Sequence, residues 1–144
     1  MVKYGLTCYK GNFSVFFLVR DVRRFRETET NLISFLNNLK IIDLVILNAG
    51  MPREIKDLKD TSLEEIHLVM EVNVWANKII IDTLLSTHKE IGQLVAVSSG
   101  ASVSGARGWN AYSLSKATLN MLIRLYAKAG RCSTAFCRSR RSYR

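Results

Sequence analysis

Residues 94–116, LVAVSSGASVSGARGWNAYSLSK, decide the expected fold. The stretch begins with four apolar residues that end in two serines, which is the pattern of a short buried strand. Small residues then continue to Gly108, and such a composition suits a loop that a ligand approaches closely. A helix is expected to follow, on which Tyr112 and Lys116 lie one turn apart on one face. Strand, loop and helix in this order predict part of a parallel α/β sheet.

The spacing of Tyr112 and Lys116 has a chemical consequence. A nearby ammonium favours phenolate over phenol, so Lys116 is expected to lower the pKa of Tyr112 from its usual value of about 10. A tyrosine tuned in this way exchanges protons near neutral pH. Ser99 lies thirteen residues before the tyrosine, and its hydroxyl can hydrogen-bond a substrate oxygen. These groups suit carbonyl reduction or alcohol oxidation with a hydride-carrying cofactor.

The flanking segments continue the alternation of strands and helices. Two apolar runs, residues 13–19 and 41–47, are expected to form strands, and the continuity of the second is typical of a strand covered on both faces. Residues 28–39 predict one helix and residues 62–88 a longer one, which carries Asn73 in its interior. A Tyr-x-x-x-Lys pair alone is a weak signal, since an exposed helical pair has the same spacing. The order of the surrounding elements strengthens it.

Five features in this order resemble the short-chain dehydrogenase/reductase family. They are D21-V22 after the first strand, N48-A49-G50 after the second, Asn73 in the long helix, Ser99 at a strand end, and Y112-S113-L114-S115-K116 at the start of a helix. The resemblance covers about residues 13–128. It implies an α/β fold with a Rossmann-like, three-layer parallel sheet, incomplete at both ends.

The resemblance also implies a role for each candidate residue. Tyr112 would be the proton donor or acceptor, and Lys116 would lower its pKa and bind the nicotinamide ribose. Ser99 would orient the substrate oxygen; Ser98 is the alternative, and the thirteen-residue interval favours Ser99. Asn73 would kink its helix, so that its main-chain carbonyl holds a water that leads to the lysine. Without the family pattern, a surface polar residue would be an equally good interpretation of this asparagine.

A site for NAD or NADP follows from the same resemblance. The residues assigned to it are Asp21 and Val22 near the adenine ring, and Asn48, Ala49, Gly50, Tyr112 and Lys116 along the cleft. The family's glycine-rich turn, which seats the diphosphate at a helix N-terminus, has no counterpart, because the sequence contains no Gly-x-Gly. The first strand–helix–strand unit is therefore expected to be absent, and the choice between NAD and NADP stays open.

Composition divides the chain near residue 128. Residues 1–128 are expected to form a partial NAD(P)-binding domain, and residues 129–144 a basic, disordered tail. Residues 131–144 carry five arginines and no acid, in a chain of net charge +9. Such a tail can attract nucleic acid or an acidic surface, but a solvated end is favoured because aromatic residues are few. The abrupt change suggests out-of-frame translation, a hypothesis that fails if no other reading frame there encodes a strand and Pro-Gly pattern.

Length and composition limit the classes of function. A chain of 144 residues suits one domain, and it has neither a leader nor an apolar stretch of membrane-spanning length, so the cytoplasm is the simplest location. The three cysteines lack metal-ligand spacing, and no metal is expected. The favoured function is NAD(P)-dependent interconversion of a carbonyl and an alcohol on a small molecule. The alternative is an inactive fragment that only self-associates, through helices 62–88 and 110–128 that pair subunits in the family.

Overall fold

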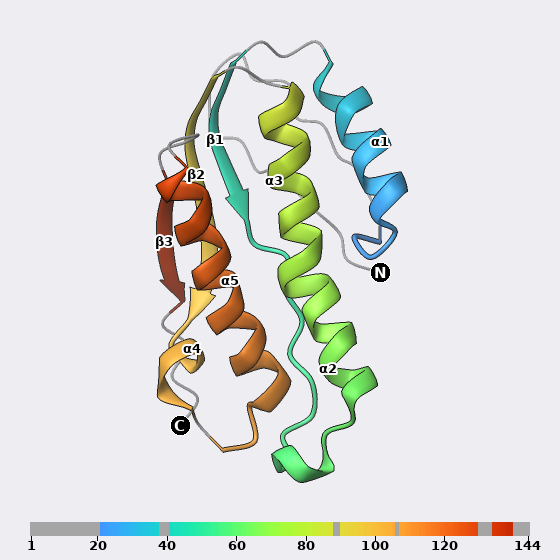
Figure 1. Ribbon diagram of the computed structural model, residues 1–144, viewed down its shortest axis with the longest axis vertical. Coiled ribbons are helices and arrows are strands. Elements are labelled where there is room, and N and C mark those ends of the chain that lie inside the picture. Colours follow the sequence, from blue (N-terminus) through green and yellow to red (C-terminus); the bar gives the residue numbers. More distant parts are fainter. Residues whose placement is uncertain (1–20, 38–40, 88–89, 106, 130–133, 140–144) are drawn as a thin grey trace, which may run out of the picture.

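The computed structural model describes residues 21–37, 41–87, 90–105, 107–129 and 134–139. Within these residues, three strands form a parallel sheet in the order β1-β2-β3 (Figure 1). The strands are β1 (Ile41–Leu47), β2 (Glu90–Ser99) and β3 (Thr134–Ser139). The helices are α1 (Phe25–Leu36), α2 (Leu63–Met70), α3 (Ala76–Thr87), α4 (Ala101–Ser104) and α5 (Asn110–Lys128). The chain thus has the incomplete, Rossmann-like α/β fold that its sequence predicts.

One apolar cluster joins the sheet to α3 and α5. Side chains two residues apart on β2 and four residues apart on α5 meet in it, as expected when one face of each element is buried. Each fully buried aliphatic side chain contributes about 1.5–3 kcal/mol. The buried members of the cluster are Leu47 of β1, Leu94 and Ala96 of β2, Ile81 of α3, and Leu119 and Ile123 of α5.

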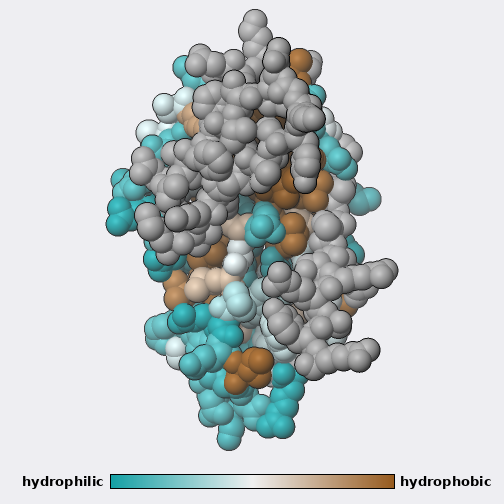
Figure 2. Space-filling view, turned by 180° about the vertical axis from the view of Figure 1, so that it is seen from behind, coloured by the Kyte–Doolittle hydropathy of each residue, from teal (hydrophilic) through white to brown (hydrophobic). Residues whose placement is uncertain are grey.

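The opposite face of β1 is open within the described residues. Leu44 and Ile46 are 50% and 56% exposed, while Val45 and Leu47 between and after them pack into the cluster. Figure 2 views the molecule from behind, and hydrophobic residues are visible there in several separate places. The prediction that 41–47 is covered on both faces is therefore wrong for the described part of the chain, which supplies two of the three layers.

Helix starts follow local signals only in part. Ser62 caps α2, because its hydroxyl accepts a hydrogen bond from the main-chain nitrogen of Glu65 at 3.2 Å. By contrast, α1 begins at Phe25, earlier than the predicted 28–39, and has no side-chain cap. Its first residue packs against a small apolar cluster around Val22. Tertiary packing thus sets the start of this helix in place of a capping residue.

The strand β3 corrects the prediction for the C-terminal segment. Thr134–Ser139 pairs in parallel with β2, with Leu94 opposite Thr134 and Ser99 opposite Ser139. The edge of β2 presents unpaired backbone groups to this segment, whose sequence TAFCRS contains residues of good β propensity. Pairing therefore overrides the basic composition, and the expectation of a disordered tail is wrong for residues 134–139. The predicted strand 13–19 and residues 130–133 and 140–144 lie outside the described residues.

Candidate active site

The carboxyl ends of β1 and β2 lie next to each other. Leu47 is opposite Ala96 in the parallel register, so Asn48–Gly50 and Ser98–Ser99 follow at the same edge of the sheet. Asn48 and Gly50 are exposed there and Ala49 is buried. Open α/β sheets bind ligands outside the carboxyl ends of their strands. The structure thus brings two of the sequence motifs to the edge where such a fold holds its ligand.

Lys116 reaches this edge from α5. Its side chain is 3% exposed, and its Nζ donates a hydrogen bond to the main-chain oxygen of Val97 at 2.7 Å. The same Nζ lies 5.7 Å from the centre of the Tyr112 ring. A Cβ on Gly50 would come within 3.3 Å of Nζ, so the glycine leaves the ammonium its room. Lys116 therefore bonds the end of β2 and lies beside the loop after β1 and the Tyr112 ring.

Burial lowers the pKa of Lys116 from 10.5 to about 8. The cause is the lost hydration of the ammonium, which disfavours the charged form. The folded protein therefore releases this proton at a lower pH than the unfolded chain does. The cost of the buried charge is full below about pH 8 and is relieved as pH rises towards 10.5.

Lys116→Met is accordingly expected to raise the free energy of unfolding at pH 7 by about 1–2 kcal/mol. Removing the buried cation gains about 3 kcal/mol, and losing the hydrogen bond to the Val97 carbonyl costs about 1–2 kcal/mol. The gain should be lost at pH 10, where the folded lysine is neutral. Chemical denaturation of both proteins at the two pH values measures this difference. Lys128→Met, at the exposed end of α5, is the control and should change little. Equal stability of Lys116→Met and the parent at pH 7 would contradict the buried charge.

Asn73 lies where the long helix is interrupted. Glu71–Trp75 forms a π-helical turn between α2 and α3, and such turns are frequent at functional sites. Asn73 is fully buried, so the interpretation as a surface residue is wrong. Its Oδ1 accepts from the main-chain nitrogen of Met51 at 2.8 Å. Its Nδ2 donates to the main-chain oxygen of Met51 at 3.2 Å and to Ser115 Oγ at 2.8 Å, which joins the loop after β1 to α5.

The main-chain carbonyl of Asn73 already has a protein donor. Asn77 Nδ2 donates to it at 2.8 Å, and Asn77 is 1% exposed. The family resemblance assigns this carbonyl to a water that leads to Lys116. In this chain the buried Asn77 side chain, which no sequence pattern singled out, already donates a hydrogen bond to that carbonyl.

The two serines at the end of β2 have different partners. Ser98 is buried, and its Oγ donates to Asn120 Oδ1 on α5 at 2.5 Å. Ser99 Oγ accepts from the main-chain nitrogen of Ala101 at 3.2 Å, and its own proton has no partner among the described residues. Ser99 can therefore donate to a substrate oxygen, whereas the Ser98 hydroxyl is engaged. This geometry favours Ser99 over Ser98.

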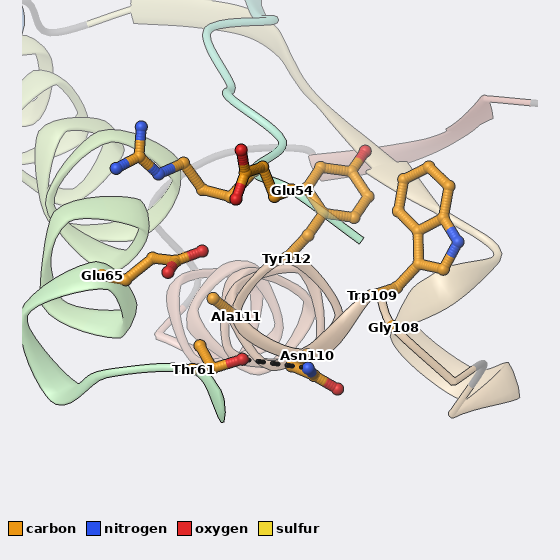
Figure 3. Close-up of a pocket in the computed structure, with 9 residues that line it drawn as sticks. Glu54, Thr61, Glu65, Gly108, Trp109, Asn110, Ala111 and Tyr112 are labelled. Atoms are coloured by element: carbon orange, nitrogen blue, oxygen red, sulfur yellow. Dashed lines mark hydrogen bonds between the residues drawn. The ribbon is translucent and has the colours of Figure 1, made fainter. Parts of the chain in front are cut away.

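Tyr112 borders a pocket at the start of α5 (Figure 3). Its ring centre is 5.5 Å from that of Trp109, and the two rings are tilted by 57°. Asn110 Nδ2 donates to the main-chain oxygen of Lys56 at 2.5 Å and to Thr61 Oγ1 at 3.1 Å, which ties α5 to the loop after β1. The remaining lining residues, which periodicity gave no reason to group, are Arg53, Glu54, Glu65, Gly108 and Ala111.

Asp21 and Val22 begin the first described segment. Val22 is buried in a cluster against which Met51 packs, so the pair lies near the loop after β1. Asp21 accepts hydrogen bonds from the Arg23 guanidinium, and these bonds lower the pKa of its carboxyl to about 2. The carboxylate is therefore ionised at neutral pH and already paired.

These residues fit the nicotinamide side of a dinucleotide. Gly50 keeps the sheet edge open beside Lys116, and an ammonium carries three donors, of which Val97 uses one. For the diphosphate, no glycine-rich turn opens a helix in the described segments. The described residues also bring together no set of three His, Cys, Asp or Glu side chains that could hold a metal ion.

Comparison with known proteins identifies a family and several relatives of this chain. The model of the short chain dehydrogenase family matches residues 6–132. An uncharacterized oxidoreductase of Schizosaccharomyces pombe is 35% identical over 86 residues, which are 57% of this chain and 34% of that protein. The benzil reductase ((S)-benzoin forming) of Saccharomyces cerevisiae is 34% identical over 86 residues, 55% of this chain and 33% of that protein. The chain thus spans about a third of the length of these relatives.

Solved structures share the fold at lower identity. A short-chain dehydrogenase from Streptomyces avermitilis superposes with a TM-score of 0.73 at 20% identity, over 83% of this chain and 45% of that one. The NADH-dependent reductase A1-R' complexed with NAD gives a TM-score of 0.71 at 19% identity, over 81% and 52%. Because the family model covers most of the sequence, the chain belongs to the short-chain dehydrogenase family.

Proposed function

We propose that the chain acts as an NAD(P)-dependent oxidoreductase of the short-chain type, which interconverts a carbonyl and an alcohol on a small molecule. The observation that supports the proposal is that the buried Lys116 of α5 lies 5.7 Å from the Tyr112 ring centre and donates to the main-chain oxygen of Val97, two residues before Ser99. The relatives support the class, since both are named as oxidoreductases or reductases. The nicotinamide cofactor, when bound, supplies or accepts the hydride.

Residues of this chain donate the proton that the substrate oxygen receives. In the reducing direction, the Tyr112 hydroxyl gives its proton to the substrate oxygen while carbon receives the hydride, so a carbonyl becomes an alcohol and the tyrosine a phenolate. The Lys116 ammonium, 5.7 Å from the ring centre, stabilises that phenolate. Ser99 donates a hydrogen bond to the same substrate oxygen and polarises it. Asn73 fixes the loop after β1 against α5 and so keeps the site in shape.

Cofactor titration tests the proposal directly. NADH or NADPH should quench the fluorescence of Trp109, which lies beside Tyr112, with micromolar saturation. The reductase of Saccharomyces cerevisiae named above is a benzil reductase, so benzil is the first carbonyl to add, and oxidation of NADH is followed at the same time. Trp109→Phe, which leaves the exposed Trp75, controls for absorption of the exciting light. No saturation with either cofactor would contradict the proposal for this chain.

A second candidate is an inactive member of the family that only self-associates. It is favoured by the absence of a glycine-rich Gly-x-Gly turn from the sequence. A normal NADH titration with full turnover would exclude this candidate.

No helix of the described segments is both long and apolar enough to cross a bilayer.

Self-association through α5 and the helix pair α2–α3 is part of both candidates. Leu114, Met121 and Leu125 are exposed on α5 at intervals of seven and four, which place them along one stripe of the helix. Met121→Glu is expected to convert a dimer into a monomer, because burying an unpaired carboxylate costs several kcal/mol. Light scattering after gel filtration measures the mass, with Lys128→Glu as a control at the helix end. A monomeric parent protein would contradict the proposed dimer.

A further inference from the structure

Asn120 lies on the face of α5 that carries the candidate active-site residues. It follows Tyr112 and Lys116 at intervals of four, so the three side chains project from successive turns of the helix. Its amide contacts the end of β2 and also α4, at residues before and after Ser99 in the sequence. Oδ1 accepts from Ser98 Oγ at 2.5 Å, and Nδ2 donates to Ser102 Oγ at 2.9 Å.

The hydrogen bonds continue from Ser102 to Ser99 itself. Ser102 Oγ donates to the main-chain oxygen of Ser99 at 2.6 Å. The main-chain nitrogen of Ala101 donates to Ser99 Oγ at 3.2 Å. Both the backbone and the hydroxyl of Ser99 are thus fixed by the first turn of α4, and Asn120 holds that turn to α5.

The chemistry of the network selects an amide at this position. Ser102 has a single hydroxyl proton, which it gives to the Ser99 carbonyl, so towards Asn120 it can only accept. Ser98 in turn must donate, because the remaining atom of the amide is an acceptor. One side chain therefore has to donate to Ser102 and accept from Ser98 at once. A carboxylate or an aliphatic side chain of the same size cannot do both.

We infer that Asn120 is a positioning residue, which holds Ser99 in register with Tyr112 and Lys116 through Ser98 and Ser102. The functional half of this inference rests on the proposed function. Asn120 contacts Ser98 and Ser102, and among the described residues no hydrogen bond joins it to Ser99, so it acts on Ser99 through these two serines. The helix that carries the tyrosine consequently also sets the position of the serine, so the two groups that face the substrate oxygen move as one unit.

A double-mutant cycle tests the inference without requiring turnover. In Asn120→Leu and in Ser102→Ala, the amide proton of Ala101, which is bonded to Ser99 Oγ, should exchange with solvent at least about tenfold faster, corresponding to the loss of one hydrogen bond. The double variant should exchange no faster than either single one, because both interrupt the same chain of bonds. Exchange in β1 should stay unchanged. An unaltered exchange rate of the Ala101 amide in the single variants, or a double variant whose increase equals the sum of the two single effects, would overturn the inference.

Steady-state kinetics with NADH and benzil separate positioning from a merely structural role. The single variants should lose about tenfold in kcat with the KM for NADH unchanged, since Ser99 and not the cofactor contact is displaced. Thr118→Val on the same helix removes a hydroxyl bonded only to the main-chain oxygen of Leu114 and should keep full kcat. If kcat of the Asn120 and Ser102 variants fell no further than kcat of Thr118→Val, the inference would be overturned. If the parent protein shows no turnover, the proposed function fails, and the exchange measurement alone decides whether Asn120 positions Ser99.

Discussion

Replacing Asn73 by alanine is expected to lower the free energy of unfolding by about 3–5 kcal/mol. The side chain is fully buried, and its amide satisfies both main-chain polar groups of Met51. Each buried group left without a partner costs about 1–3 kcal/mol, and the space vacated by the amide adds a cavity term. Ser115 loses less, because its hydroxyl still donates to the main-chain oxygen of Tyr112 at 2.7 Å.

Chemical denaturation of Asn73→Ala and the parent measures this loss. Asn37→Ala is the matched control, because Asn37 is exposed at the end of α1 and should change stability by less than about 0.5 kcal/mol. Asn73→Asp separates hydrogen bonding from packing. Its carboxylate cannot donate to the Met51 oxygen, so this variant should be less stable at pH 7 than at pH 4, where part of the acid is protonated and can donate. A loss below about 1 kcal/mol in Asn73→Ala would contradict the assigned bonds.

The elements with strong periodicity could be predicted from the sequence. The apolar run 41–47 coincides with β1, and the predicted helix 110–128 coincides with α5. Both could be predicted because their apolar patterns depend only on residues close together in the sequence. The family and its incomplete α/β fold followed from motif order. Asn73 was recognised only through that order, because an asparagine inside a helix looks the same in sequence whether it is buried or exposed.

Features that depend on distant partners could not be predicted in the same way. The strand β3 forms because β2 leaves a free edge, which a window of TAFCRS does not reveal. The π-helical turn at Glu71–Trp75 accompanies contacts between Asn73 and residues 22 and 42 positions away. Asn120 could have been noticed, since it continues the four-residue spacing of Tyr112 and Lys116. Its partners, however, lie 18 and 22 residues away in sequence, and only the packing of α5 on β2 brings them within reach.

Tyr112→Phe is expected to reduce carbonyl turnover by about 10²–10⁴-fold, the usual contribution of a positioned proton donor. The substitution removes one oxygen and retains the ring that packs beside Trp109 and under Lys116. Binding of NADH should therefore be little changed, and the loss should appear in kcat. Oxidation of NADH in the presence of benzil measures turnover, and quenching of Trp109 fluorescence measures binding.

Tyr126→Phe on the same helix is the matched control. Its hydroxyl donates to Asp82 Oδ1 of α3, far along α5 from the strand edge, so its removal should cost about 1 kcal/mol of stability and leave kcat intact. A structural effect of losing any tyrosine hydroxyl would lower the activity of both variants alike. Loss confined to Tyr112→Phe assigns the proton to Tyr112, because the two substitutions are chemically identical and differ only in where the oxygen lies. Equal turnover in Tyr112→Phe and the parent would remove Tyr112 from the reaction and would require another donor at the strand edge.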